Sequence, residues 1–97
     1  MAIIKKGTEN SHKMENSDTR VAVISIIVEN PDSVPKINEI LHSAADNIIG
    51  RMGIPYKKKN INIISIVIDA KLDVISMVSG KLGRLPGVTA KTAYSKK

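Results

Sequence analysis

Two apolar stretches decide the fold of this chain: residues 21–28 (VAVISIIV) and residues 61–68 (INIISIVI). Both are rich in β-branched side chains, which favour extended strands over helices. The two runs share a pattern, VISIIV and IISIVI, at an offset of forty residues. An acid follows each run, Glu29 in the first and Asp69 in the second, and a helical pattern follows each acid. The chain therefore contains two similar halves, each built on a buried strand.

The first helix is predicted from a turn and a periodic apolar face. Residues 30–33 (NPDS) have the chemistry of a turn, and either Asp32 or Ser33 is predicted to cap the helix that follows. Apolar side chains then recur at steps of three and four residues, which is typical of one helix face: Val34, Ile37, Ile40, Leu41, Ala44 and Ala45. We expect this helix to end near Asn47.

The second half begins with a glycine-punctuated strand at residues 48–56 (IIGRMGIPY), whose two glycines predict a bulge or a close backbone approach. Residues 57–60 (KKKN) make a turn before the second long strand. Asp73 is predicted to cap a second helix, whose apolar face comprises Val74, Met77, Val78 and Leu82. Residues 86–87 (PG) turn the chain into a last strand at residues 88–94 (VTAKTAY).

The predicted order is strand, helix, strand, strand, helix, strand. Two strand–helix–strand units with right-handed crossovers interleave into a four-stranded antiparallel sheet with both helices on one face. The fold class is therefore α+β, a ferredoxin-like βαββαβ sandwich over residues 20–97. Residues 1–19 are polar without an apolar period and are predicted to be a flexible N-terminal tail. Met14 in this tail is a candidate start of the natural protein.

The composition excludes several classes of function. The 97 residues contain no cysteine, which excludes disulfide scaffolds, thiol nucleophiles and iron–sulfur clusters. With one histidine in the folded region, His42, and no Gly-x-Ser-x-Gly elbow, we expect no catalytic residues, no metal site and no cofactor. The longest apolar run is too short to span a bilayer, and Lys5 and Lys6 interrupt any secretory pattern, so a cytoplasmic protein is predicted.

Positive charge gathers in the folded region. The formal net charge is +6, and residues 20–97 hold all of the excess, with twelve Lys and Arg against six acids. Candidate contacts to an anion or a nucleic acid are Lys57, Lys58, Lys59, Lys81 and Arg84. The alternative is a solvated hairpin tip. The central strands carry no aromatic side chains, so RNA binding by base stacking on the sheet is not expected.

Both long strands are apolar on both of their faces. Two helices can cover only one face of the sheet, so the other face should be left bare. Because an exposed apolar sheet face is unusual in a monomer, we predict that another copy of the chain covers it. The alternative is a cover from the N-terminal tail, where only Ile3 and Ile4 could contribute.

A small-molecule pocket is predicted where two segments meet. We expect residues 29–33 and residues 50–53 to lie at one end of the sheet and to face a neighbouring copy. Glycine would let backbone N–H groups reach a ligand there. The candidate ligand-binding residues are Asn30, Asp32, Gly50, Arg51 and Gly53. A structural role for both glycines is the alternative.

Three stretches resemble a known family: residues 38–42 (NEILH), 51–55 (RMGIP) and 79–88 (SGKLGRLPGV). They are similar to the iron-only hydrogenase system regulators. The resemblance implies an ACT-like fold, similar to the C-terminal sensor domain of the nickel-responsive regulator, and implies oligomerisation and a part in controlling or supporting hydrogenase expression. Nickel and DNA binding do not carry over, because this chain lacks the histidine and cysteine ligands and has no ribbon-helix-helix domain.

The function expected from the sequence is a non-enzymatic regulatory or sensor domain of the iron-only hydrogenase system. It would bind a small effector at a homo-oligomer interface and signal to a separate partner. One alternative is a non-catalytic accessory protein that binds a hydrogenase maturation factor or the hydrogenase itself. Another is a weak nucleic-acid-binding transcriptional regulator. No membrane partner is expected.

Overall fold

The structure is a computed structural model that describes residues 3–6 and 18–97. The strands are β1 (Ile3–Lys6), β2 (Arg20–Val28), β3 (Ile48–Tyr56), β4 (Ile61–Ala70) and β5 (Val88–Tyr94). The helices are α1 (Val34–Ser43) and α2 (Leu72–Gly83). Short 3-10 turns are η1 (Pro31–Ser33), η2 (Ala45–Asn47) and η3 (Lys57–Lys59).

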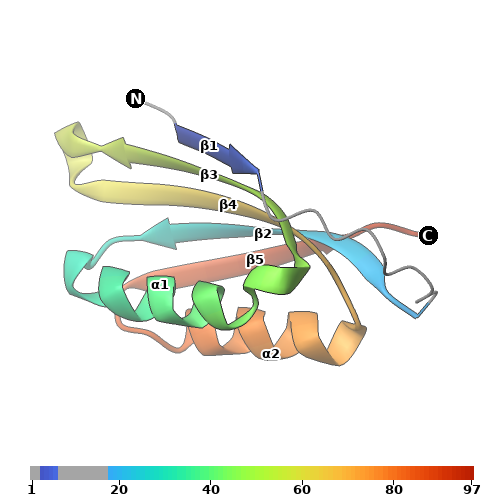
Figure 1. Cartoon of the computed structure of the whole chain (residues 1–97). Coiled ribbons are helices and arrows are strands. Elements are labelled where there is room, and N and C mark those ends of the chain that lie inside the picture. The colour runs from blue at the N-terminus through green and yellow to red at the C-terminus, as the bar shows by residue number, and fades with distance from the viewer. Residues whose placement is uncertain (1–2, 7–17) are drawn as a thin grey trace.

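The strands form one antiparallel sheet in the order β1-β3-β4-β2-β5, and both helices lie on one side of it (Figure 1). Strands β2 to β5 with α1 and α2 make the βαββαβ arrangement. The ferredoxin-like α+β fold predicted from the sequence is therefore confirmed. The other side of the sheet faces away from both helices.

The N-terminal residues correct the prediction of a tail over residues 1–19. Ile3–Lys6 form β1, which pairs antiparallel with β3 and makes the sheet five-stranded. Two isoleucines at the start of this stretch suit a strand, but four residues are too few for a period of two to stand out in the sequence. Residues 1–2 and 7–17, including the candidate start Met14, lie outside the described residues.

The internal repeat sits at the centre of the sheet. Strands β2 and β4 pair along their whole length, and Ser25 lies directly opposite Ser65. These two serines occupy equivalent positions of the forty-residue repeat. The strands therefore run past each other about a local pseudo-two-fold axis through this pair, which places equivalent residues of the two halves symmetrically on each face.

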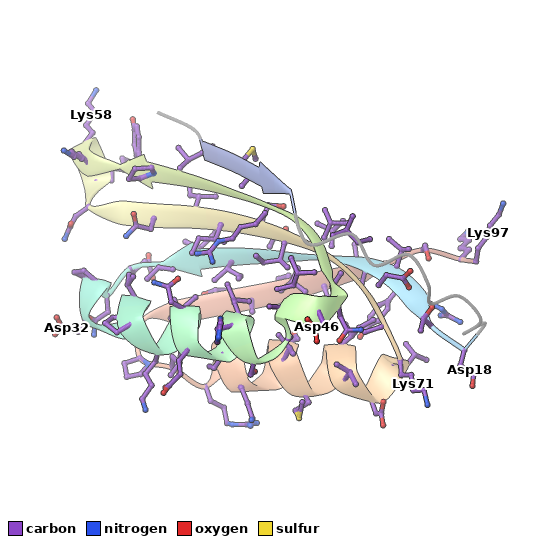
Figure 2. All side chains as sticks on the ribbon, in the orientation of Figure 1. Asp18, Asp32, Asp46, Lys58, Lys71 and Lys97 are labelled. Carbon is purple, nitrogen blue, oxygen red and sulfur yellow. The ribbon has the colours of Figure 1, made fainter. Side chains whose placement is uncertain are left out.

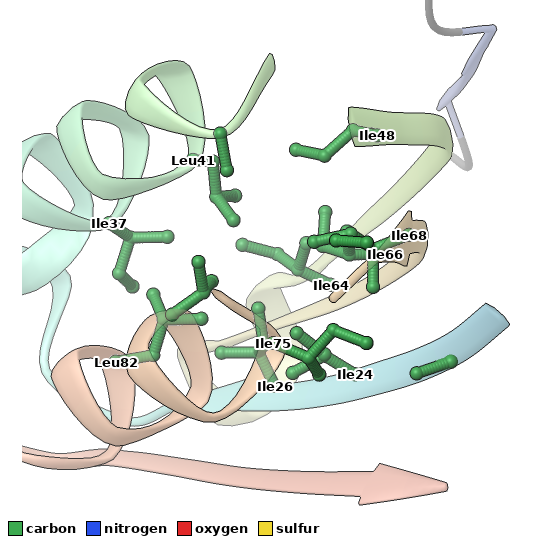
Figure 3. Close-up of a cluster of buried hydrophobic side chains, with 14 of the residues drawn as sticks. Ile24, Ile26, Ile37, Leu41, Ile48, Ile64, Ile66, Ile68, Ile75 and Leu82 are labelled. Atoms are coloured by element: carbon green, nitrogen blue, oxygen red, sulfur yellow. The ribbon is translucent and has the colours of Figure 1, made fainter. Parts of the chain in front are cut away.

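The core lies between the helices and one face of the sheet. Alternate residues along β2 and β4 are buried, because successive side chains of a strand point to opposite faces. Figure 3 shows the isoleucines of these strands meeting side chains from both helices. The core residues with no more than 1% exposure that line this layer are Ala22, Ile24, Ile26, Val28, Ile37, Ile66, Ile68, Ala70, Ile75, Val78 and Leu82.

The starts and ends of the helices differ from the sequence prediction. Helix α1 ends at Ser43 rather than near Asn47, and η2 fills the interval. Ser33 occupies the N-cap position of α1, but neither its side chain nor that of Asp32 makes a cap hydrogen bond. The side-chain cap is one turn earlier, where Asn30 accepts a hydrogen bond from the Asp32 N–H at the start of η1.

The second helix begins without a side-chain cap. Lys71 occupies the N-cap position, and Asp73 lies in the first turn, where its negative charge suits the positive end of the helix dipole. The buried face includes Ile75, whereas Met77 is exposed. The buried face of α2 therefore differs from the predicted one, because it contains Ile75 and not Met77.

Candidate functional site

The face of the sheet opposite the helices carries large apolar side chains that are exposed. On β2 these are Val21, Val23 and Ile27, with exposed fractions of 39%, 37% and 43%. On β4, Ile63 lies opposite Ile27 and Val67 lies opposite Val23. Within the described residues no helix covers this side (Figure 1). We call it the open face, comprising Val21, Val23, Ser25, Ile27, Met52, Ile54, Ile63, Ser65, Val67, Asp69, Thr89, Lys91 and Ala93.

The strand register divides the open face into rows that cross the sheet. One row joins Val67, Val23 and Ala93, and another joins Ile54, Ile63 and Ile27. Between these two apolar rows runs a third row of Met52, Ser65, Ser25 and Lys91. The open face is thus two apolar bands on either side of a band that contains two small hydroxyls and one lysine.

The predicted ligand residues do not come together within one chain. Gly50 and Arg51 lie within β3, where Gly50 is opposite Val67, not at an end of the sheet. Asn30 follows β2, whose last residue Val28 is opposite Asn62 of β4. The expectation that residues 29–33 and 50–53 share one end of the sheet is therefore wrong. A site using both segments needs two copies of the chain.

Residues 29–33 instead join the two halves of the fold through Glu29, Asn30 and Ser33. The Glu29 N–H donates to the Gly87 carbonyl at 2.7 Å, and the buried Ser33 hydroxyl donates to the Pro86 carbonyl at 2.7 Å. Gly87 has φ +69°, and a Cβ at this position would lie 2.6 Å from the Asn30 Cβ. This junction was missed in the sequence because its partners are more than fifty residues apart.

Arg51 is the predicted site residue with the clearest electrostatic character. Its side chain is half-buried on the helix side of β3, and its guanidinium donates to the side-chain amide oxygen Oδ1 of Asn38 on α1 at 2.9 Å. Within the described residues, the one ion pair is between Lys36 and Glu39, so no acid there neutralises Arg51. A half-buried cation with an amide partner can accept an additional anionic group.

The two glycines of β3 differ in their surroundings. A register shift between Ile48 and Gly50 forms a bulge, as the sequence predicted. At Gly53 a Cβ would meet nothing within 4 Å, so no close backbone approach explains this glycine. The same stretch of β3, from Gly50 to Gly53, pairs with β1 at the edge of the sheet.

The predicted basic residues are all exposed but do not form one patch. Lys57, Lys58 and Lys59 make up η3, between β3 and β4, whereas Lys81 and Arg84 lie at the end of α2. Figure 2 shows Lys58 at the same end of the molecule as Asp32. Strand β2 lies between β4 and β5 in the sheet. The segment that follows β2, with Glu29 and Asp32, therefore separates the two basic groups. Nucleic-acid contact by these residues stays a prediction.

Two further features of the described chain concern membranes and metals. No helix in residues 3–6 and 18–97 is long and apolar enough to cross a membrane. In the same part of the chain, no three His, Cys, Asp or Glu side chains gather where they could hold a metal ion. His42 is exposed on α1.

The antiparallel core, its strand order and its two helices on one face define the class of this protein as an ACT-like, ferredoxin-fold domain. Residues 20–92 match the TM1266-like family, described as "Iron-only hydrogenase system regulator, putative". The chain belongs to this family. A solved structure, that of the uncharacterized protein TM1266 from Thermotoga maritima, is similar with a TM-score of 0.77 and 34% identity, covering 80% of this chain and 99% of that one. None of the curated proteins matches the chain.

Proposed function

We propose that the protein is a non-catalytic regulator of the iron-only hydrogenase system that works as a homo-oligomer joined through the open face. The observation that carries this proposal is the exposed apolar surface itself. With strands about 4.8 Å apart and about 3.3 Å per residue, four strands of seven residues present roughly 400 Å2 in projection. Apolar patches of this size on a folded domain mark interaction surfaces.

A second copy is the partner that fits the open face best. Two such faces packed together place apolar band against apolar band, and a two-fold axis is the common symmetry of such contacts. Sheets pack about 10 Å apart with interdigitated side chains, which the β-branched residues of β2 and β4 suit. Near the axis, Ser25 and Ser65 can hydrogen-bond across the interface, while Lys91 on β5 reaches solvent at the rim.

The proposal includes a small effector with an anionic group, held at a second contact between copies on the helix side of the sheet, because Arg51 lies on that side and not on the open face. Arg51 supports this, because it is half-buried and only the neutral Asn38 is bonded to it among the described residues. Asn30 and Asp32 of a neighbouring copy would complete such a site, since one chain keeps them apart from Gly50, Arg51 and Gly53. Effector binding would change how the oligomer contacts a separate protein of the hydrogenase system.

Thermal unfolding with a panel of amino acids and nucleotides tests the effector site. A ligand that raises the unfolding temperature of the natural protein should fail to do so with Arg51→Met. Lys36→Met is the matched control, because Lys36 is an exposed cation on α1 whose loss leaves Arg51 in place. Equal shifts in all three proteins, or none with any compound, contradict the effector site and leave the open-face association untouched.

The regulatory role has its own test in cells. Hydrogenase transcript and hydrogenase activity are measured after deletion of the gene and after complementation with the natural chain or with Ile27→Asp. The proposal expects deletion to change both readouts, the natural chain to restore them, and Ile27→Asp to fail because it prevents association. Hydrogenase output that is the same in every strain contradicts the proposal.

A further inference from the structure

The outer edge of β3 has a short regular stretch bounded by two devices that oppose strand pairing. At one end is the bulge between Ile48 and Gly50, and at the other is Pro55, which has no N–H to donate. Natural sheets use bulges and prolines to keep edges from pairing with other chains. Between the bulge and Pro55, only residues 50–54 present a regular edge.

Strand β1 occupies this same stretch. Ile3 pairs with Gly53 and Lys6 pairs with Gly50, so the four residues of β1 cover four of the five regular positions and none outside that stretch. Figure 1 shows β1 alone on the outer side of β3. The family match begins at residue 20, after β1, and the Thermotoga structure is covered almost completely while a fifth of this chain lies outside the match. The β3 edge is therefore uncovered in the part of the fold that the family shares.

We propose that β1 is an internal guard strand: it fills a strand-acceptor site on the edge of β3 and thereby prevents that edge from pairing with the β3 edge of a second copy. An uncovered edge offers a row of unpaired backbone N–H and C=O groups, which a second strand can satisfy by sheet extension. Two β3 edges related by a two-fold axis pair antiparallel and join two sheets into one. This contact lies at the side of the sheet and is separate from the open face.

Covalent attachment makes so short a strand effective. Four residues in trans have few hydrogen bonds to offset the entropy lost on binding, but tethering raises their effective concentration to the order of millimolar. The edge is therefore guarded in the intact chain, and loss of residues 1–17 by cleavage or by an alternative start would release it. Removal of β1 thus acts as a switch from one assembly to a larger one.

Sedimentation equilibrium of the full chain and of a chain lacking residues 1–17 tests the proposal. The expected result is that the truncated chain has twice as many copies per assembly as the full chain at the same concentration. A synthetic peptide of residues 1–8 at several millimolar should return the truncated chain to the number of copies of the full chain. Because the expected result is a ratio, it holds whether the full chain is a dimer through the open face or a monomer.

A matched pair of lysine substitutions in the truncated chain identifies the edge as the new contact. Gly53→Lys places a charge on the β3 edge, and Gly83→Lys places the same charge at the end of α2; a Cβ meets nothing within 4 Å at either position. The proposal expects Gly53→Lys to abolish the doubling and Gly83→Lys to keep it. Equal numbers of copies per assembly for the full and truncated chains would overturn the proposal. A doubling that persists both with the peptide and with Gly53→Lys would overturn it as well.

A second variant covers the case in which the truncated chain does not fold. In the full chain, Ile3→Gly with Ile4→Gly lowers the strand propensity of β1 without shortening the protein. In dilute solution, where the released edge is unpaired, hydrogen exchange should accelerate at least tenfold at those amides of residues 50–53 that face β1. At higher concentration the number of copies per assembly should double, as in the truncated chain. Unchanged exchange at these amides together with an unchanged mass would show that β1 does not guard the edge.

Discussion

The two faces of the sheet are built from the same kinds of residue but have opposite environments. On β2, Ile24 and Ile26 are completely buried under the helices, whereas Ile27 on the open face is 43% exposed. On β4 the same holds for Ile66 and Ile63, which are 0% and 39% exposed. An apolar side chain on the helix side stabilises the single chain, whereas one on the open face can be buried only by another molecule. Strand composition on the two faces is therefore alike although the single chain buries only one of them, which is the basis of the proposed association.

The largest expected effect is the loss of association on placing a charge in the open face. Ile27→Asp puts two carboxylates into a two-fold interface, and each uncompensated buried charge costs about 3–5 kcal/mol. The dissociation constant measured by sedimentation should rise by at least about a thousandfold. Met77→Asp is the control, since Met77 is an exposed apolar residue of α2, on the other side of the molecule from the open face. Equal effects of both substitutions would argue against an interface centred on the apolar bands.

A matched pair of alanine substitutions on β4 measures the difference between the faces in stability. Ile66→Ala removes a fully buried side chain and should lower the free energy of unfolding by about 2–5 kcal/mol. Ile63→Ala should cost less than about 1 kcal/mol in dilute solution, where the open face is uncovered. Urea unfolding at low and high protein concentration measures both. The cost of Ile63→Ala should increase with concentration, and a cost independent of concentration would contradict the proposed interface.

The junction at Gly87 joins the two halves of the fold through the Glu29–Gly87 and Ser33–Pro86 hydrogen bonds. Its loss should have an intermediate effect on the free energy of unfolding. Gly87→Ala forces a Cβ into left-handed backbone at about 1–2 kcal/mol, and that Cβ also overlaps Asn30. The free energy of unfolding should fall by at least this amount. Gly53→Ala is the control, because open space surrounds its Cβ. Thermal unfolding measures both variants, and similar unfolding temperatures would contradict a stabilising role of the junction.

The smallest expected effect is at Ser33. Ser33→Ala removes the buried hydroxyl bonded to the Pro86 carbonyl and should cost about 1 kcal/mol. Ser43→Ala is the control, because its hydroxyl bonds an exposed carbonyl of its own helix that water can satisfy. Chemical denaturation of both variants measures the difference. Association through the open face should be unchanged in either, since Ser33 lies on the helix side.

The sequence was sufficient for the repeating part of the fold. The two apolar runs and their forty-residue repeat predicted β2 and β4 and put alternate residues on opposite faces, but not which face the helices bury, because both faces are apolar. The sequence did not predict the contacts between residues that are distant along the chain. Ser33 with Pro86 and Arg51 with Asn38 depend on how the two halves pack, and no local pattern predicts such pairs.

The candidate site shows the same limit. That one apolar face of the sheet stays uncovered follows from composition and strand period, but which residues lie on it depends on the side that the helices take. The ligand residues were grouped by placing residues 50–53 at one end of the sheet, whereas Gly50 to Gly53 lie within strand β3, past the bulge. Strand β1 was missed because four residues give neither a period nor a turn signal, and only its pairing with β3 defines it.

The most direct test of the open-face account is the mass of the natural full chain in solution across a range of concentrations. Sedimentation equilibrium from about 1 to 100 µM covers the affinities of stable interfaces of this size. We predict a dimer that Ile27→Asp converts to a monomer with the same helix and strand content. A natural chain that stays monomeric throughout this range would contradict the account.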